Sequence, residues 1–205
     1  MQRFYDRYVL PYLIDLACGV KPVQRQRAKV VPRASGRVLE IGIGTGRNLP
    51  FYDKGRLTAL SGLDPAGHMH RLARKRMRES GIDVRLLTLS AEQIPEASAS
   101  FDTLVMTYTL CSIPDPVRAV KEMRRVLKPQ GRLLFCEHGL APDTVVQKWQ
   151  RRLTPIWKRI GGGCHLDRDI PALLREGGFR VAEVQTMYLP GPRATSFNLW
   201  GTALP

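Results

Sequence analysis

A short apolar run that breaks into closely spaced glycines constrains the fold of this chain more than any other stretch. In VLEIGIGTGRNLP, residues 38–50, a strand-length run leads directly into Gly42, Gly44 and Gly46, and a polar, helix-starting stretch follows. A strand, a tight glycine turn and a helix N-terminus place a ligand at the carboxyl edge of a parallel sheet. The stretch therefore predicts an α/β fold that binds a small molecule at that edge.

Apolar runs of strand length alternate with helical patterns along the chain, which is typical of a parallel sheet built from βαβ units. Five such runs are RVLEIG, LTALSGLD, DVRLLTLS, FDTLVMTYTL and GRLLFCEH. Two last strands, RVAEVQTMYL and SFNLWGTAL, are joined by the turn-forming PGPR and are expected to be antiparallel. Just before them, a helix is expected to be capped by Asp167 and ended by Gly177 and Gly178. We expect an α/β, Rossmann-like sheet of seven strands, five parallel and a C-terminal antiparallel hairpin, flanked by helices.

The length of 205 residues and the hydrophobic content of 43% suit one domain with a full core. We divide this single domain into N-terminal lid helices (1–35), a cofactor-binding core (36–140), a lid or substrate insertion (141–165) and a C-terminal helix and hairpin (166–205). No apolar run reaches the roughly 20 residues of a membrane span, and the N-terminus lacks the order of a signal peptide. The expected location is the cytoplasm.

The four cysteines are scattered without a CxxC pair and are interpreted as reduced thiols. Cys136 with His138, and Cys164 with His165, could be drawn as a zinc site, but two-ligand clusters of that spacing often arise by chance. We therefore expect no metal site.

Two acidic residues indicate the kind of ligand. The glycine spacing is G-x-G-x-G, not the G-x-G-x-x-G of dinucleotide-binding turns. Glu40, two residues before the first glycine, would repel a pyrophosphate but suit an ammonium or a sulfonium. Asp64, at the end of the next strand, can accept hydrogen bonds from both hydroxyls of a ribose. A cationic adenosyl ligand fits both carboxylates.

Five stretches, LEIGIGTG, GLDP, LSAEQIP, FDTLVMTYTL and VLKPQGRLLF, resemble the successive motifs of class I S-adenosylmethionine-dependent methyltransferases over about residues 36–135. The resemblance implies S-adenosylmethionine as the cofactor. By it, the glycines make room for the methionine moiety, Asp64 takes the ribose, and Met69 packs beside the adenine. The cofactor-binding residues that it implies are Glu40, Gly42, Gly44, Gly46, Asn48, Asp64, Pro65, Met69, Ala91, Glu92 and Thr107. Taken singly, such residues also suit purely structural roles: a glycine turn, a helix cap, a core residue or a solvated turn.

A missing motif and two further resemblances limit which class of molecule accepts the methyl group. Where methyltransferases of nucleic acid bases usually carry Asn/Asp-Pro-Pro-aromatic, this chain has TYTL, residues 107–110. The stretch LCSIPDPVRAVKEMRRVLKPQGRLLFCEH and the later WQRRLTPIWKRIGGGC are similar to methyltransferase-like thiol S-methyltransferases, which implies S-methylation of a small thiol or hydrogen sulfide. VLEIGIGTGRNLPFY also resembles bacterial phospholipid N-methyltransferases, so N-methylation of phosphatidylethanolamine is the alternative.

Glu137 and His138 end the strand beside the expected position of the methyl group. A neutral acceptor must lose a proton, and an imidazole with a pKa of about 6.5 can accept a proton from a thiol with a pKa of about 8.5. His138 is therefore the candidate base, and Glu137 is expected to orient it. The alternative for His138 is a strand-end histidine bonded to backbone. Cys111 and Cys164 are expected to be buried small residues instead of methyl carriers.

Two amphipathic segments are expected to act as lids. RFYDRYVLPYLIDL has an apolar stripe with Arg3 and Arg7 alongside, and the segment 143–160 carries Trp149 and Trp157 among basic residues. Core-facing packing is the commoner fate of such stripes, although a basic helix with tryptophans can also lie in a membrane interface.

The net charge of +14 favours an anionic partner or surface but does not identify it. We expect a small-molecule acceptor, keep an anionic membrane surface as a possible partner, and expect no specific nucleic acid. A non-catalytic nucleic-acid binder on the same scaffold is the competing class, supported by basic blocks at 71–78, 118–132 and 148–159. Against it, the sequence contains no recognised nucleic-acid module, and most of the charge falls on outer helix faces.

Overall fold

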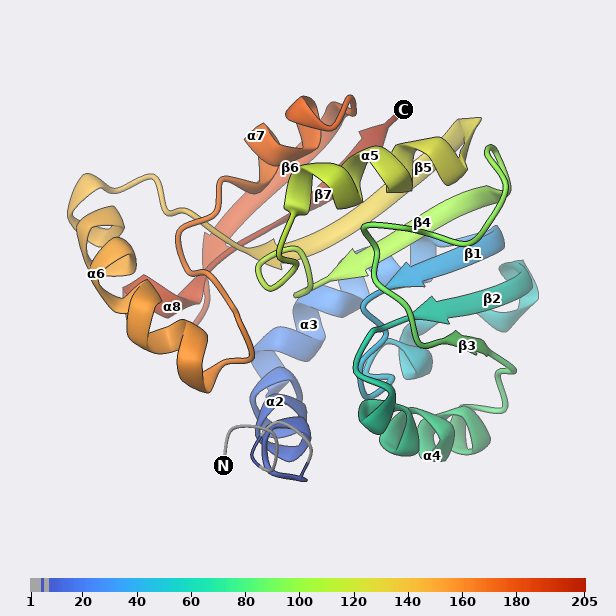
Figure 1. The fold of residues 1–205 in the computed structure, drawn as a ribbon, viewed down its shortest axis with the longest axis horizontal. Helices are drawn as coiled ribbons and strands as arrows, with labels where there is room; N and C mark the ends of the chain where they lie inside the picture. Colours follow the sequence, from blue (N-terminus) through green and yellow to red (C-terminus); the bar gives the residue numbers. More distant parts are fainter. Residues whose placement is uncertain (1–4, 6–7) are drawn as a thin grey trace.

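The computed structural model describes residue 5 and residues 8–205, and its centre is a seven-stranded sheet in the order β3-β2-β1-β4-β5-β7-β6 (Figure 1). Strands β1 to β5 pair in parallel, and β7 is antiparallel to both β5 and β6. The expected five parallel strands and C-terminal hairpin are confirmed. The strands are β1 Gly36–Ile41, β2 Leu57–Leu63, β3 Arg85–Leu87, β4 Phe101–Thr107, β5 Leu127–His138, β6 Arg180–Tyr188 and β7 Phe197–Leu204.

Side chains alternate along the strands between two cores, because successive residues of a strand point to opposite faces. Leu39 and Leu104 pack with α5 and α7 on one face, and Val38 and Val105 pack with the end of α3 on the other. The helices are α2 Leu10–Cys18, α3 Lys21–Val30, α4 His70–Ser80, α5 Pro116–Val126, α6 Thr144–Ile160, α7 Ile170–Glu176 and α8 Arg193–Ser196.

The N-cap of α7 corrects one expectation. Its cap is Asp169, whose side chain accepts a hydrogen bond from the backbone N–H of Ala172 at 3.0 Å. The Asp167 carboxylate, expected in that role, instead lies 3.2 Å from the Thr154 hydroxyl. The expected end of the helix is confirmed, since the chain leaves α7 at Gly177.

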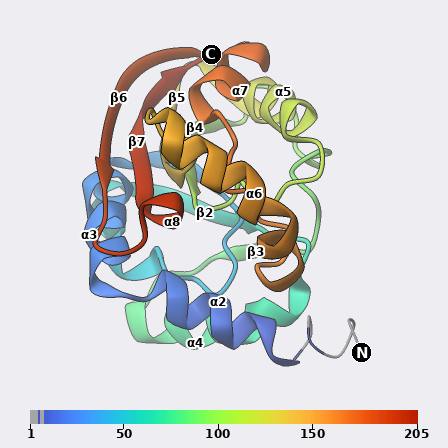
Figure 2. The same ribbon diagram turned by 90° about the vertical axis from the view of Figure 1, so that its left-hand side faces the viewer.

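The carboxyl ends of the parallel strands point toward α2 and α6 (Figure 1), and Figure 2 looks onto this edge with both helices near the viewer. Helix α6 keeps part of its apolar stripe exposed: Trp149 is 53% and Ile156 63% accessible. On α2, Leu16 is 71% accessible. Arg3 and Arg7, expected beside the N-terminal stripe, lie outside the described residues. Among the residues described, no helix combines the length and apolar character needed to cross a bilayer.

Candidate active site

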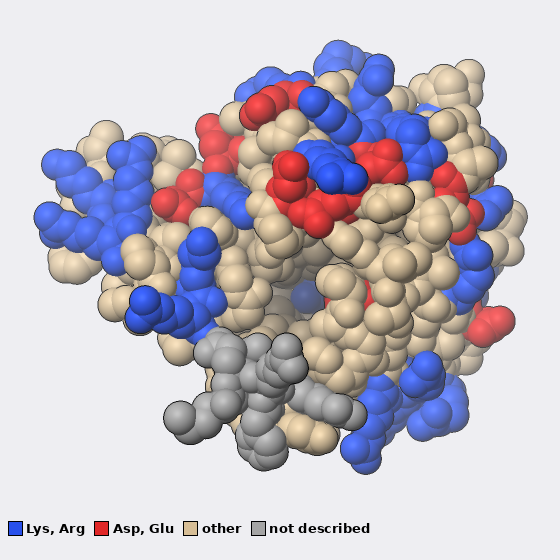
Figure 3. Space-filling model, viewed as in Figure 1, with Lys and Arg blue, Asp and Glu red and all other residues tan. Residues whose placement is uncertain are grey.

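A pocket of about 970 Å³ opens at the carboxyl edge of the sheet, between the strand ends and the helices α2 and α6. Figure 3 shows the molecule hollowed near the centre of this view. Of the residues that the sequence predicted for the cofactor, five line the pocket: Gly42, Asp64, Pro65, Met69 and Ala91. His138, the candidate base, lines the same pocket. The sheet edge, the glycine turn, α2 and α6 therefore line one shared space.

The glycine turn brings the ends of β1 and β4 together. Gly42 has φ +70°, and a Cβ added there would lie 2.3 Å from the Thr109 side chain, so no larger residue fits. Gly44 has φ +51°, but an added Cβ would make only ordinary contacts: Met69 Sδ at 3.7 Å, Asp64 Oδ2 at 3.8 Å and the Gly42 carbonyl oxygen at 3.9 Å. Gly42 thus serves the close approach of two strand ends, whereas Gly44 faces side chains of the pocket.

Asp64 is oriented by backbone donors on both of its oxygens. The Gly44 N–H donates to Oδ2 at 2.9 Å and the Ala66 N–H to Oδ1 at 2.8 Å. Burial raises the pKa of Asp64, and the two backbone hydrogen bonds oppose that rise. Each carboxylate oxygen can accept a further hydrogen bond. The side chain is therefore held in place with acceptor capacity left for two neighbouring hydroxyls.

A buried polar network lies behind the glycine turn. Glu40 accepts hydrogen bonds from the Tyr52 hydroxyl at 2.8 Å and from Asn48 Nδ2 at 3.0 Å. Asn48 also donates to the Thr107 hydroxyl, and Arg27 donates to Asn48 Oδ1 at 2.8 Å and to the same hydroxyl. Burial raises the pKa of Glu40 to about 7, against these hydrogen bonds and the Arg27 charge. Three predicted residues thus form one connected group, and a cation nearby would favour the ionised form of Glu40.

Arg27 was not predicted, and no local signal marks it among the many basic residues of its segment. It is only 5% accessible, and its Nε has no hydrogen-bond partner among the described residues. The α3 helix carries it from outside the recognised motifs into the group beneath the cofactor residues.

A second unpredicted residue, Asp15 of α2, connects that helix to the glycine turn and to α4. Its carboxylate accepts hydrogen bonds from the Thr45 hydroxyl at 2.6 Å, from Arg47 Nε at 2.9 Å and from Arg76 Nη1 at 2.8 Å. Burial opposes ionisation, but these hydrogen bonds outweigh it and lower the pKa of Asp15 to about 2. We call these four residues the Asp15 latch. Gly46, in the same turn, packs closely against α4.

Three side chains gather at the pocket from different segments. Cys111, from the loop after β4, His138, at the end of β5, and Cys164, from the loop after α6, place their ligating atoms within 4.8 Å of one another. His138 Nε2 lies 3.1 Å from Cys164 Sγ. We call these three residues the Cys–His–Cys cluster. It joins residues that the sequence had considered separately.

The cluster favours a thiolate on one sulfur. Hydrogen bonding from Cys111 and His138 outweighs burial and lowers the pKa of Cys164 to about 4, whereas the pKa of Cys111 is raised well above its usual value. Burial lowers the pKa of His138, but the neighbouring Cys164 reverses this and raises it. Of the two cysteines, Cys164 is therefore the one that more readily carries a thiolate.

Two residues of the zinc pairs considered from the sequence, Cys136 and His165, have other partners. Cys136 Sγ lies 3.6 Å from the Tyr108 hydroxyl in the core on the α3 side of the sheet. His165 Nδ1 lies 3.8 Å from an Asp167 oxygen, and its backbone N–H donates to the Cys111 carbonyl. Tertiary contacts, not spacing along the chain, decide which cysteine meets which histidine.

Glu137 is fully buried and braces the loop after β4. Its carboxylate accepts the backbone N–H groups of Thr109 at 2.8 Å and Leu110 at 3.2 Å. The preceding residue, Tyr108, has φ +54°, a conformation rare for a side-chain-bearing residue. Burial raises the pKa of Glu137 to about 7. The side chain thus positions the loop that carries Cys111; its expected role in orienting His138 stays a prediction.

Glu92 faces the start of α5. It accepts hydrogen bonds from the Asp115 backbone N–H at 2.6 Å and from the Ser90 hydroxyl at 2.8 Å. These contacts hold the turn that carries Ala91 to the neighbouring helix. Reading of the adenine edge by Glu92 stays a prediction.

Comparison with known proteins agrees with this architecture. The family model described as a methyltransferase domain matches residues 39–135. Thiol S-methyltransferase TMT1B of Homo sapiens is 38% identical over 166 residues, covering 78% of this chain and 66% of the relative, and the Rattus norvegicus protein is 36% identical with coverage of 76% and 64%. The chain thus spans slightly less than two thirds of these two relatives. A phosphatidylethanolamine N-methyltransferase of Cereibacter sphaeroides is 33% identical, covering 93% of this chain and 92% of that protein.

Solved structures share the fold over most of the chain. A possible histamine N-methyltransferase of Thermotoga maritima, titled an S-adenosylmethionine-dependent methyltransferase, is 25% identical with a TM-score of 0.68 and covers 100% of this chain and 99% of its own. A structure from Bacillus halodurans, titled a putative methyltransferase, has a TM-score of 0.71 at 15% identity, covering 88% of this chain and 96% of its own. At that low identity, the second match concerns the fold alone.

Proposed function

The chain belongs to the S-adenosylmethionine-dependent methyltransferases, and we propose that it methylates the sulfur of a small, largely apolar thiol or of hydrogen sulfide. The observation that carries this proposal is the Cys–His–Cys cluster, which lines the same pocket as Asp64 and Met69. Methyl transfer requires an acceptor lone pair in line with the bond that breaks and, for a neutral acceptor, a place for its proton. The cluster supplies polarisable and titratable groups beside the cofactor residues.

The residues of the other part of the pocket fit S-adenosylmethionine, which when bound supplies a methyl group activated by a sulfonium. Asp64, held by two backbone N–H groups, retains acceptor capacity for a ribose. The Gly44 side of the turn leaves room beside Met69. Glu40, whose buried carboxyl is poised near neutrality, suits the positive charge of the ligand.

Among the candidate acceptors, a thiol needs the least catalytic assistance from the groups of this pocket. A thiolate is already a strong nucleophile, so the enzyme must mainly align it and help remove one proton. Leu13 and Leu16 of α2 and Ile160 of α6 line the approach, which favours an apolar substituent on the acceptor. We propose that His138 belongs to the catalytic group that activates the acceptor sulfur, with Glu137 holding the adjoining loop.

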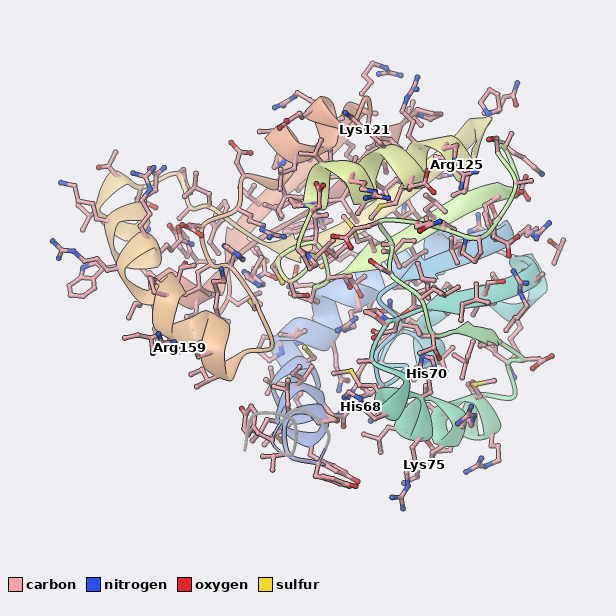
Figure 4. All side chains as sticks on the ribbon, in the orientation of Figure 1. His68, His70, Lys75, Lys121, Arg125 and Arg159 are labelled. Carbon is pink, nitrogen blue, oxygen red and sulfur yellow. The ribbon has the colours of Figure 1, made fainter. Side chains whose placement is uncertain are left out.

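Phosphatidylethanolamine N-methylation is the second candidate, and two observations favour it. The relative with that activity matches nearly its whole length. Exposed apolar side chains of α6 share that helix with five basic residues, and Figure 3 shows Lys and Arg gathered over α6. Arg159, labelled on that helix in Figure 4, lines the pocket. A lipid headgroup could reach the pocket from this side, with the protein attached peripherally to an anionic surface.

The decisive experiment offers both acceptors to the same preparation. Methyl transfer from labelled S-adenosylmethionine is measured to an alkyl thiol and, separately, to phosphatidylethanolamine in vesicles or detergent, with the products identified by mass. We expect an S-methyl thioether from the thiol. Product formed only from the lipid would reject the thiol and select the second candidate.

Replacement of His138 tests its part in the reaction. His138→Ala should lower thiol methylation at neutral pH by about 10²-fold, the scale of general acid–base catalysis, while leaving cofactor affinity close to that of the wild type. His165→Asn, which changes the histidine next to Cys164 in the loop after α6, is the matched control and should leave the rate close to wild type. A rate indifferent to His138 would keep the methyltransferase and remove His138 from its mechanism.

A further inference from the structure

We propose that Cys111, His138 and Cys164 form a binding site for a thiophilic divalent cation, Zn²⁺ above all, with an open position directed into the pocket. The use of that position by an acceptor sulfur rests on the thiol S-methyltransferase function proposed above. The cation site itself rests on the three side chains.

The separations within the cluster suit a common metal ion. A tetrahedral Zn²⁺ with bonds of about 2.3 Å to sulfur holds its ligand atoms about 3.7 Å apart. The three ligand atoms here lie within 4.8 Å of one another, and His138 Nε2 is already 3.1 Å from Cys164 Sγ. Small side-chain rotations would therefore bring all three to one ion.

The donor set selects the class of ion. Two cysteine sulfurs and one imidazole nitrogen are soft ligands that favour Zn²⁺ and disfavour Mg²⁺ or Ca²⁺, which prefer oxygen. Three protein ligands with a fourth position left open are typical of catalytic zinc, whereas structural zinc is closed by four. All three residues line the large pocket, so the open position faces the space that an acceptor would occupy.

The three ligand-bearing segments are fixed to one another. The backbone N–H of His165, next to Cys164, donates to the Cys111 carbonyl at 2.9 Å. Glu137, next to His138, accepts the N–H of Leu110, next to Cys111. These hydrogen bonds position the ligand residues before an ion binds, as supporting contacts do in known metal sites.

The charges of the site balance with a thiol acceptor. One Zn²⁺ with two cysteine thiolates is neutral, and an added acceptor thiolate gives a net charge of −1. Arg168 compensates for it: its guanidinium donates to the Leu110 carbonyl and interacts electrostatically with both Cys111 and Cys164. Glu137 also interacts with Arg168, but burial raises the pKa of its carboxyl to about 7, which reduces its negative charge near neutral pH. The Arg168 guanidinium can therefore offset the charge of an anionic fourth ligand.

The resulting step conserves atoms and electrons. With the cation bound, His138 acts as a ligand in place of the base considered above. The acceptor thiol binds the cation through sulfur, which lowers the pKa of the thiol, and releases its proton to solvent. A sulfur lone pair forms the new bond to the methyl carbon, while the bond between that carbon and the sulfonium breaks and leaves its electron pair on the cofactor sulfur. The methyl thioether is a weaker ligand than the thiolate and leaves. No oxidant or reductant takes part.

The test uses the full chain, stripped of metal with a chelator under a reductant that does not bind metals. Zn²⁺ is titrated against a chromophoric chelator, and Co²⁺ serves as the spectroscopic probe. We expect about one ion per chain, a thiolate-to-Co²⁺ charge-transfer band, and protection of Cys111 and Cys164 from alkylation. Because all three readouts use the wild-type protein, they remain informative even if a variant fails to fold.

Ligand variants then locate the ion. Cys111→Ser, Cys164→Ser and His138→Asn should each weaken Zn²⁺ binding by about 100-fold or more, beyond the 10- to 100-fold typical of losing a supporting contact. The matched controls, Cys136→Ser and His165→Asn, should bind as the wild type does. Weakening by the controls to the same extent would place the ion elsewhere and contradict the proposal.

The outcomes separate this inference from the proposed function. No binding of Zn²⁺ or Co²⁺, or Co²⁺ binding without a thiolate band, would overturn the metal site, and thiol methylation at full rate by the metal-free protein would reject its part in the reaction. In both cases the thiol S-methyltransferase proposal would stand. Tight Zn²⁺ binding together with methylation of the lipid alone would support the metal site and reject the thiol S-methyltransferase proposal.

Discussion

The two parts of the pocket are built in different ways. The cofactor part consists of a glycine turn and Asp64, held mainly by backbone groups within about one βαβ unit of sequence. The part proposed for the acceptor consists of Cys111, His138 and Cys164, which two loops and the end of β5 bring together. A site formed by backbone groups depends on local conformation, whereas a site formed by side chains from distant segments depends on how those segments pack. The two parts should therefore respond differently to substitution.

The largest effect is expected at the glycine turn. Gly42→Ala would combine a strained backbone with a 2.3 Å contact to Thr109, and should lower the free energy of unfolding by about 2–5 kcal/mol. Gly44→Ala, also at positive φ but without a close contact, should lose only about 1–2 kcal/mol. Urea unfolding of both variants without cofactor measures the difference. Equal losses would mean that the close approach of β1 and β4 does not limit residue choice.

Removal of the Asp64 carboxylate should affect one part of the pocket alone. Asp64→Ala should weaken S-adenosylmethionine binding by roughly 1.5–3 kcal/mol, about ten- to a hundredfold, through loss of hydrogen bonds to a charged acceptor. Calorimetry gives the affinity, and Co²⁺ binding to the cluster, measured in parallel, should not change. Unchanged cofactor affinity would remove Asp64 from the site, and a changed Co²⁺ spectrum would join the two parts that we separate.

A smaller loss of stability is expected when the Asp15 latch, which connects α2 to the glycine turn, loses its charge. The pKa of Asp15 in the folded protein, about 2, lies below the ordinary aspartate value of 3.8, so its stabilisation is fully present above about pH 4 and is lost as the pH falls toward 2. Asp15→Asn should therefore lower the free energy of unfolding by about 1–2 kcal/mol at pH 7, and progressively less below pH 4. Urea unfolding across that range, with the exposed Asp83→Asn as control, tests the prediction. A deficit that persists at pH 2 would exclude the carboxylate charge as its source.

The same contrast explains what the sequence could reveal. The strands follow from the local periodicity of apolar residues, so the parallel sheet and the hairpin were predictable. The glycine turn and Asp64 lie directly after two of these strands, and the turn has a conformation that favours glycine. Cys164 and His138, in contrast, are 26 residues apart and separated by all of α6. Sequence spacing favoured Cys136 and His165 as the nearer partners, and neither joins the cluster. Arg27 and Asp15 were missed for the same reason, since their partners come from other elements.

The place of β7 between β5 and β6 has a consequence for how the protein emerges from the ribosome. Every other strand is synthesised before β7, whose Asn198 pairs with His138 in the sheet and accepts the Tyr108 hydroxyl. A nascent chain can therefore assemble the cofactor part early, while the edge of β5 stays unpaired until β7 arrives. An unpaired edge is open to association with other chains. Translational pausing shortly before β7 would lengthen the time for which newly made copies can pair with one another.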